Sequence, residues 1–396
     1  MNQAIKILDI QESTWLKVFP LTKDIPLEEQ VHCPACNIPL KVLCLLVNRK
    51  RDQKIRYGLC PSCGYMGYID RPQRSWMIDF YTMRWDKTTP LTEAEIRNRT
   101  FLPGQGVNPS GYLAVSLVSK INLNKNQAIC DIGSGYGEAL TYFKGLGYEN
   151  LIGIENSKHR ADLVNKIFGF QIFHGEFENQ KIQEKLSSYK NPIGLFFSHQ
   201  VLEHVYHPQE ILGHVSALQE LGGHVVIAVP NATGEHINHA PLFLPHLHSF
   251  TKKSIETLLN KNGYEVVVDN SVASDIIVAA RKVENPQPKI TSSPDYFEIA
   301  LARLKKGFAT NLLRKGRICQ LHWGRHQDQD HSQIISDSTE GIIPRVLWYL
   351  SKKFVHMKIM VLKRFVPGCT MLVTCGENKE SSFEIQFHDK ILLLIK

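Results

Sequence analysis

Short apolar runs alternate with longer amphipathic segments through the middle of the chain. The runs are rich in Val, Ile, Leu and Phe and occupy positions 129–132, 151–155, 170–173, 193–198 and 224–229. Each run has the length of a strand, and the segments between them are long enough for helices. This alternation predicts βαβ units and therefore a parallel sheet whose strands are joined by crossover helices.

The segments around these runs carry helical signals. Residues 209–221 place Ile211, Val215 and Leu218 on one helical face before Gly222, which is a typical helix stop. Residues 157–168 open on a serine cap in the same way.

The last part of this region predicts how the sheet closes. An amphipathic segment at 251–262 precedes two strand-like runs at 264–269 and 274–280, which are too close together for anything but a hairpin. The pattern predicts an α/β, Rossmann-like domain over 105–282, with five parallel strands and an antiparallel hairpin.

The first two runs end in residues suited to a nucleoside. Asp131 precedes a turn containing Gly133, Ser134 and Gly135, whose backbone is largely bare. Glu155 ends the second run, where a carboxylate can accept both hydroxyls of a ribose. A ligand can therefore lie against the turn and the N-terminus of the next helix, at the carboxyl edge of the sheet.

The charge of this motif separates two kinds of nucleoside ligand. A dinucleotide site needs a further glycine where this chain has Glu138. Asp131 and Glu138 would repel phosphates, whereas carboxylates attract the sulfonium and ammonium groups of S-adenosylmethionine. The motif resembles motif I of the class I S-adenosylmethionine-dependent methyltransferases, Asp-x-Gly-x-Gly-x-Gly. The resemblance implies that fold, ribose contacts from Glu155 and an adenine contact from Glu176.

The segment after the fourth run lies at the same edge of the predicted sheet. It opens with His199 and Gln200, which we assign to the cofactor site because ligands bind outside the carboxyl ends of such strands. The stretch from 198 to 205 resembles the ubiquinone-type O-methyltransferases and the sugar C-methyltransferases. Metal-assisted O-methyltransferases of that subgroup carry Glu-x-x-Glu-His here. Gln200 replaces the first acid, which argues against a divalent metal at the methyl site.

Histidines gather in the loops after the fourth and fifth runs. Methyl transfer to a hydroxyl requires removal of its proton, and an imidazole is a suitable base near neutral pH. The run 242–250 resembles the His-Glu-His-Leu-Ser-Tyr-Phe run of the sugar C-methyltransferases, which implies a catalytic role for His246. His204 falls where that family has an active-site histidine. Pro245 replaces the preceding glutamate, so the oriented Glu–His pair of that family is missing.

Two Cys-Pro-x-Cys motifs stand near the N-terminus. Their cysteines are Cys33, Cys36, Cys60 and Cys63. Four thiolates complete a tetrahedral shell with no open position, which is typical of structural zinc. The insert 41–59 predicts two strands around a basic tip.

The two N-terminal segments are assigned as follows. We predict a zinc-ribbon module at 1–75 and an aromatic linker at 76–104, which contains Phe80, Tyr81 and Trp85. This aromatic stretch resembles the segment that joins a ribbon to the methyltransferase domain in the same subgroup. The resemblance implies that the linker helps to roof the substrate pocket.

The region 283–396 follows the completed sheet as an accessory α+β addition. Residues 344–367 carry six basic residues and no acid among apolar ones. This pattern fits a helix packed on its own protein, and it also fits peripheral contact with an anionic membrane. The runs 371–374, 383–387 and 391–395 predict a small sheet. No stretch is long and apolar enough for a membrane span, and no export signal is evident, so we expect a cytoplasmic protein.

Overall charge bears on the acceptor. The 46 basic and 38 acidic residues give a net charge of +8, whereas nucleic-acid-binding proteins usually show a denser basic face. We therefore expect methylation, on oxygen or carbon, of a small-molecule or glycan-precursor acceptor with help from a histidine. Two alternatives stay open. The ribbon could hold RNA, as in ribosomal RNA methyltransferases with an N-terminal zinc finger, or the domain could bind the cofactor without turnover as a scaffold.

Overall fold

The computed structural model describes eleven stretches of the chain. They are residues 6–9, 25–48, 53–81, 91–99, 109–234, 244–290, 294–300, 320–322, 370–374, 382–388 and 391–395. The chain divides into two compact units, residues 1–303 and residues 304–396.

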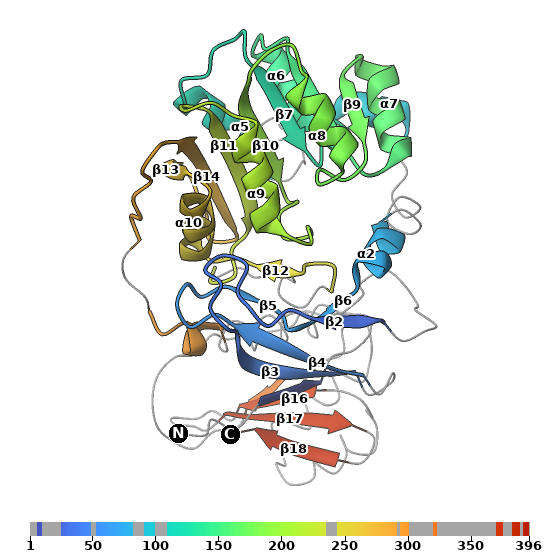
Figure 1. Ribbon diagram of the computed structural model, residues 1–396. Helices are drawn as coiled ribbons and strands as arrows, with labels where there is room; N and C mark the ends of the chain where they lie inside the picture. Colours follow the sequence, from blue (N-terminus) through green and yellow to red (C-terminus); the bar gives the residue numbers. More distant parts are fainter. Residues whose placement is uncertain are drawn as a thin grey trace. The chain divides into compact units, whose positions relative to one another are not determined.

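A seven-stranded sheet forms the centre of the first unit (Figure 1). Its strands are β7 (Ala128–Ile132), β8 (Leu151–Glu155), β9 (Gln171–His174), β10 (Ile193–His199), β11 (His224–Pro230), β13 (Tyr264–Asp269) and β14 (Asp275–Lys282). Their spatial order is β13-β14-β11-β10-β7-β8-β9. Strands β7 to β11 pair in parallel, and β14 runs antiparallel to both β11 and β13. The structure confirms the predicted α/β fold class with its closing hairpin.

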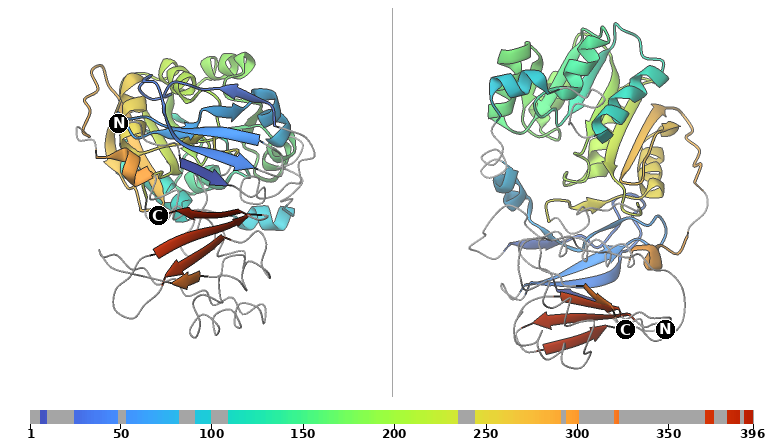
Figure 2. Two further views of the ribbon diagram at one scale, coloured as in Figure 1. Left: turned by 90° about the horizontal axis from the view of Figure 1, so that it is seen from below. Right: turned by 180° about the vertical axis from the view of Figure 1, so that it is seen from behind.

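Helices cover both faces of this sheet (Figure 2). One face packs against α5 (Pro109–Ser116), η2 (Leu117–Lys120), α6 (Glu138–Gly145) and α7 (Lys158–Phe168). The other face packs against α8 (Gln180–Ser187), α9 (Pro208–Ala217) and α10 (Lys252–Lys261). Side chains of Ser157 and Thr251 cap α7 and α10, as the sequence predicts for α7. Helix α9 ends four residues earlier than predicted, because the Gln219 amide turns inward to Ile193 O and His224 O.

The strand order indicates where along the edge of the sheet a ligand can bind. The chain leaves β7 toward β8 on one side and returns to β10 on the other, so the connections diverge between β7 and β10. Open α/β sheets bind ligands at such a switch point, outside the carboxyl ends of the strands. The turn after β7 and the turn after β10 both lie there.

The N-terminal segment forms a second sheet, with strand order β1-β3-β4-β5-β12, and a two-stranded ribbon, β2-β6. These strands are β1 (Lys6–Asp9), β2 (Leu27–Glu29), β3 (Lys41–Asn48), β4 (Gln53–Leu59), β5 (Met66–Tyr68), β6 (Asp70–Pro72) and β12 (His248–Ser249). The two strands predicted within 41–59 are β3 and β4, while residues 49–52 of the basic tip lie outside the described residues. We refer to residues 25–72 as the cysteine ribbon.

Two short helices occupy the segment predicted as an aromatic linker. They are α2 (Arg74–Phe80) and α4 (Glu93–Asn98). A capping box between Thr92 and Glu95 begins α4. Trp85 lies outside the described residues.

The second unit contains a four-stranded sheet. Its strands are β15 (Gln320–His322), β16 (Thr370–Thr374), β17 (Ser382–His388) and β18 (Ile391–Ile395), in that spatial order. The last three contain the runs predicted as a small sheet. The basic segment 344–367 lies outside the described residues. Among the residues that the structure describes, no helix is long and apolar enough to cross a bilayer.

Candidate functional site

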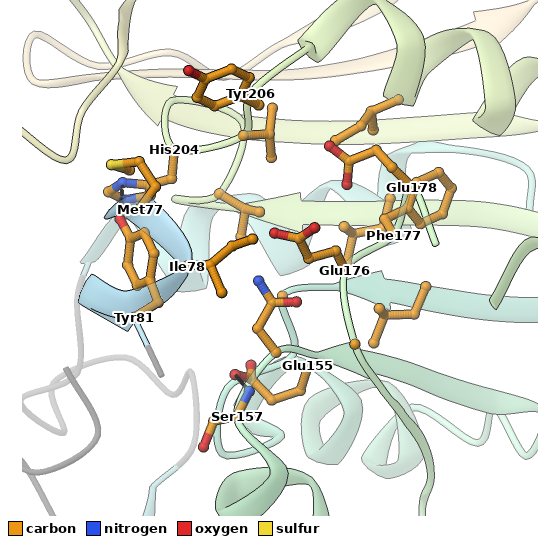
Figure 3. Close-up of a pocket in the computed structure, with 18 of the residues that line it drawn as sticks. Met77, Ile78, Tyr81, Glu155, Ser157, Glu176, Phe177, Glu178, His204 and Tyr206 are labelled. Carbon is orange, nitrogen blue, oxygen red and sulfur yellow. Dashed lines mark hydrogen bonds between the residues drawn. The ribbon is translucent and has the colours of Figure 1, made fainter. Parts of the chain in front are cut away.

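A cavity of about 460 Å³ opens at the carboxyl edge of the large sheet (Figure 3). The turns after β7, β8, β9 and β10 and the side chains of α2 form its wall. Six predicted site residues line it: Gly133, Gly135, Glu155, Glu176, Gln200 and His204. Tyr81 and His204 lie together at one end, away from Glu155 and Ser157 (Figure 3). After the roles predicted for their residues, we call the end at Glu155 the cofactor end and the end at His204 the acceptor end.

The glycine turn leaves the backbone bare at the cofactor end. Gly133 has φ +74°, and a Cβ there would lie 2.4 Å from Val201 Cγ2. Gly135 has φ +54°, a conformation that side chains disfavour. Both positions therefore favour glycine, Gly133 for space and both for backbone conformation.

Glu155 is fixed by backbone amides. One carboxylate oxygen accepts a hydrogen bond from Ser157 N and the other accepts one from Gly135 N, each at 2.9 Å. A carboxylate has about four acceptor positions, so both oxygens can still accept a ribose hydroxyl. The geometry at Glu155 thus fits the nucleoside end of S-adenosylmethionine.

Glu176 lies at the cavity wall but is joined to α2. Arg74 Nη2 donates to Glu176 Oε2 at 2.6 Å. The side chains are 43% and 35% exposed, so solvent screens much of this interaction. The ion pair connects α2 to the loop after β9, where the adenine contact is predicted.

Gln200 occupies a strained position in the turn after β10. Its φ is +56°, which non-glycine residues rarely adopt. Gln200 N donates to Ala228 O at 2.8 Å, and its side-chain amide donates to Asp275 Oδ1 at 2.8 Å. These bonds hold the strained turn against β11 and β14. Strain of this kind is concentrated at functional sites.

Three predicted cofactor residues do not line the cavity. Asp131 is buried within β7 on the face opposite Ile132, and burial raises the pKa of its carboxyl well above the ordinary value. His199 Nε2 lies 2.9 Å from Ser110 Oγ of α5, and burial lowers the pKa of its imidazole to about 4. Ser134 is buried beside Gly153. Their roles in cofactor binding stay predictions.

His204 lines the acceptor end, and its hydrogen bonds fix which ring nitrogen carries the hydrogen. Its Nδ1 lies 3.0 Å from Pro245 O and 2.7 Å from Tyr81 Oη. Because the carbonyl oxygen can only accept, Nδ1 carries the hydrogen and Nε2 keeps its lone pair. Burial lowers the pKa of His204 to about 4, so the imidazole is neutral at neutral pH.

Glu203 lies next to this lone pair. Its side chain is 1% exposed, and Oε1 is 3.8 Å from His204 Nε2. Within the described part of the chain, neither carboxyl oxygen has a hydrogen-bond partner. Burial raises the pKa of Glu203 to about 8, so the carboxyl is largely protonated at neutral pH.

His246 joins this pair from the loop after β11. Its ring centroid is 4.5 Å from that of His204, and the ligating atoms of Glu203, His204 and His246 all lie within 4.8 Å of one another. The structure thus brings the two predicted catalytic histidines together. The sequence predicted no acid beside His246, and the fold supplies Glu203 from the other loop. Two imidazoles and a carboxylate are also a donor set for a divalent cation.

Helix α2 supplies Met77 and Ile78, which sequence reasoning did not assign, and it is followed by Tyr81, which belongs to the linker expected to roof the pocket. Met77, Ile78 and Tyr81 line the cavity, and Tyr206 lines it from the turn after β10. The only signal for Tyr81 in the sequence is the aromatic stretch that the family resemblance links to the pocket roof. The short α2 has no side-chain cap and no long apolar period to reveal it.

The four predicted metal-ligating cysteines form one cluster. The Sγ–Sγ separations are 3.5 Å for Cys33–Cys63, 3.3 Å for Cys36–Cys60 and 3.8 Å for Cys36–Cys63. Tetrahedral zinc with Zn–S bonds of about 2.3 Å requires separations of about 3.8 Å, so small shifts would suffice. Hydrogen bonding within the cluster lowers the pKa of Cys60 to about 2 and raises the pKa values of Cys33 and Cys63. The cluster geometry therefore suits a thiophilic cation.

Residues 111–268 match the family model of a methyltransferase domain. The fold is that of the class I methyltransferases. No curated protein matches the chain. The matched residues run from within α5 to within β13 and include the glycine turn, Glu155 and both predicted catalytic histidines.

Solved structures of methyltransferases are among those similar to this chain. An S-adenosylmethionine-dependent methyltransferase from Mesorhizobium loti is 13% identical, with a TM-score of 0.34 and coverage of 44% of this chain and 98% of its own. An Aquifex aeolicus enzyme of the same description is 14% identical, with a TM-score of 0.35 and coverage of 49% and 100%. Magnesium protoporphyrin IX methyltransferase from Synechocystis is 13% identical, with a TM-score of 0.36 and coverage of 52% and 97%.

Proposed function

We propose that this protein transfers a methyl group from S-adenosylmethionine to an oxygen or carbon of a small-molecule or glycan-precursor acceptor, with a histidine as base. The observation that carries the proposal is the pairing of two ends in one cavity. Gly133, Gly135 and Glu155 offer a nucleoside site, and His204, whose Nδ1 carries the hydrogen and whose Nε2 can accept a proton, lines the opposite end.

The residues of the acceptor end account for proton removal. When bound, S-adenosylmethionine supplies a methyl group on a positively charged sulfur that becomes neutral on transfer. His204 Nε2 takes the acceptor proton, and its Nδ1–H stays bonded to Pro245 O. The net charge of the cavity is then unchanged, because a positive imidazole appears as the positive sulfur disappears. Glu203, 3.8 Å from Nε2, stabilises that imidazolium when its carboxyl is ionised.

The cavity lining favours a small acceptor. Met77, Ile78, Val205 and Tyr206 line the acceptor end with apolar surface, and α2 lies across it. Pockets with mostly apolar walls and a few fixed polar groups are typical of small-molecule sites. This lining supports a compact acceptor over a duplex nucleic acid.

We also propose that one zinc ion binds Cys33, Cys36, Cys60 and Cys63. Cys33 and Cys63 are each 1% exposed and Cys60 is fully buried, so the ion would be closed to solvent and structural. Metal analysis of purified protein should find one zinc per chain, and Cys60→Ser should lose it. Zinc retained in full by Cys60→Ser would contradict the assignment. Cys44→Ser, at a buried cysteine outside the cluster, is the control.

The acceptor class can be tested with methyl-labelled S-adenosylmethionine and fractionated host extract. Label in a small-molecule or glycan-precursor fraction, lost with His204→Ala and kept with the exposed His159→Ala, supports the proposal. Label in RNA would support the ribbon-bound RNA alternative. Cofactor binding without label in any fraction would support the scaffold alternative.

A further inference from the structure

The loop that carries His246 is part of the cysteine ribbon's sheet. Strand β12 pairs antiparallel with β5, with His248 opposite Gly67 and Ser249 opposite Met66 (Figure 1). A Cβ on Gly67 would lie 2.9 Å from Leu247 O, so the ribbon backbone approaches this loop as closely as only glycine allows. The loop that holds His246 beside His204 is therefore anchored on the ribbon.

His248 links the ribbon to the turn that carries His204. Its Nε2 lies 2.9 Å from Val205 O, so Nε2 carries the hydrogen and Nδ1 accepts from Tyr65 Oη at 2.6 Å. Its backbone N donates to Glu203 O at 3.1 Å. His248 is 2% exposed, and both ring nitrogens are hydrogen-bonded in one tautomer. One side chain thus joins three segments that are far apart in the sequence.

Further bonds tie the same loop to the second cysteine knuckle. Thr251 Oγ1 donates to Cys63 O at 2.6 Å, and Tyr57 Oη lies 2.9 Å from Ser249 Oγ. Tyr65 itself follows Cys63 by two residues. The cysteines and Tyr65 also share a hydrophobic cluster with Phe250 and α10. A shift of the knuckle would therefore be transmitted to both histidine loops.

We propose that His248 is a positioning residue for methyl transfer and that, through Tyr65, it couples occupancy of the four-cysteine site to the placement of His204 and His246. The proposal rests on the proposed function only for the roles of those two histidines. A misplacement of about 1 Å at a catalytic group can cost about 100-fold in rate, so a remote hydrogen bond can matter for turnover.

A matched pair of tyrosine variants separates positioning from general stability. Tyr65→Phe and Tyr264→Phe each remove one buried hydroxyl, which is hydrogen-bonded to His248 in the first case and to Gln219 in the second. With labelled S-adenosylmethionine and the extract fraction that accepts label, Tyr65→Phe should lower kcat about 10- to 100-fold with the KM for S-adenosylmethionine within about 2-fold. Tyr264→Phe should leave kcat within about 2-fold. Equal kcat losses in the two variants would overturn the proposal.

Hydrogen exchange tests the coupling without any methyl transfer. Removing the metal with a chelator under reducing conditions should raise amide exchange about 10-fold or more at 199–207 and 244–251. Exchange in β7 and β8 should change by less than about 2-fold. Tyr65→Phe should raise amide exchange at 199–207 and 244–251 even though the variant retains its metal. No change at 199–207, or an equal rise throughout the large sheet, would overturn the coupling. Failure of the extract assay alone would leave this result standing and would count against the proposed function.

Substitution of His248 supplies a rescue test. His248→Gln keeps an N–H that can reach Val205 O, whereas His248→Leu has no donor. The Gln variant should recover at least about 10-fold of the kcat that the Leu variant loses, with equal zinc content in both. Indistinguishable kcat values for Gln and Leu would show that only the volume of the side chain matters and would overturn the positioning role.

Discussion

The two ends of the cavity are built in different ways. The cofactor end comes from one continuous βαβ unit, in which Glu155 contacts a turn only 20 residues earlier, at Gly135. The acceptor end joins segments separated by 123 residues at Tyr81–His204 and by 183 residues at Tyr65–His248. A local motif therefore forms the cofactor end, whereas tertiary contacts, some of them with the cysteine ribbon, bring together the histidines of the acceptor end.

The carboxyls of the two ends differ as well. Glu155 receives two backbone hydrogen bonds, so its charge is compensated before any ligand arrives. Glu203 receives none from the described residues, and burial raises its pKa to about 8. The first arrangement suits a permanent acceptor of hydroxyl hydrogen bonds. The second suits a group whose charge changes during the reaction.

Replacing the acceptor-end base should have the largest effect. His204→Ala removes the bare Nε2, and turnover should fall by about 10² to 10⁴-fold because general base catalysis contributes that much. The dissociation constant of S-adenosylmethionine should change by less than about 3-fold, since His204 lies away from Glu155. Calorimetry together with the label assay checks both values. A large loss of cofactor affinity would mean that the two ends are not separate.

The buried acid at the acceptor end should make stability depend on pH. The folded pKa of Glu203 is about 8, above its ordinary value of 4.5, so folding favours the protonated form. That contribution is full below pH 4.5 and is lost as pH rises toward 8, at about 1.4 kcal/mol per pKa unit.

A neutral replacement should remove this dependence. Glu203→Gln should therefore gain a few kcal/mol of unfolding free energy relative to the native protein between pH 5 and pH 8. Denaturant unfolding at both pH values measures the gain, with the exposed Glu149→Gln as control. If the free energy of unfolding differed between variant and native protein by the same amount at pH 5 and at pH 8, Glu203 would not be neutral in the folded protein.

At the cofactor end, Glu155→Ala should weaken S-adenosylmethionine binding by about 1.5 to 3 kcal/mol, as expected for hydrogen bonds to a charged group. Calorimetry gives the affinity directly. Glu149 lies outside the cavity, just before β8, so Glu149→Ala should bind normally. Unchanged affinity in Glu155→Ala would remove the ribose contact from the account.

The Arg74–Glu176 ion pair, which joins α2 to the loop after β9, should have the smallest effect on cofactor binding. Arg74 and Glu176 are both more than a third exposed, so Arg74→Ala should change S-adenosylmethionine affinity by less than about 5-fold. Glu176→Ala should cost more than Arg74→Ala if Glu176 contacts adenine. An equal loss in both would indicate that the ion pair itself, rather than an adenine contact, sets the affinity.

The sequence was sufficient for features that repeat or lie close together. Apolar runs predicted the strands of the large sheet, and β16 to β18 were predicted in the same way. The glycine turn and Glu155 were found because one short motif holds both. Glu176 and Gln200 were placed through the loops that follow predicted strands.

Features that depend on distant pairing could not be predicted. Strand β12 has two residues and exists because β5 pairs with it, so no periodicity marks it. The sequence indicated that the acid beside His246 was missing, because Glu203 approaches from another loop. Asp131 was assigned to the cofactor site through its motif, and His199 through its place after the fourth run. The structure places Asp131 on the face of β7 opposite Ile132 and His199 against α5, and their cofactor roles stay predictions.

A crystal structure of the zinc-loaded protein with S-adenosylhomocysteine would test the central claim most directly. The account predicts that the ribose hydroxyls bind Glu155, that the adenine lies near Glu176, and that the sulfur faces His204 and Tyr81 across the acceptor end. A ligand bound with its sulfur directed away from His204, or bound outside this cavity, would contradict the account.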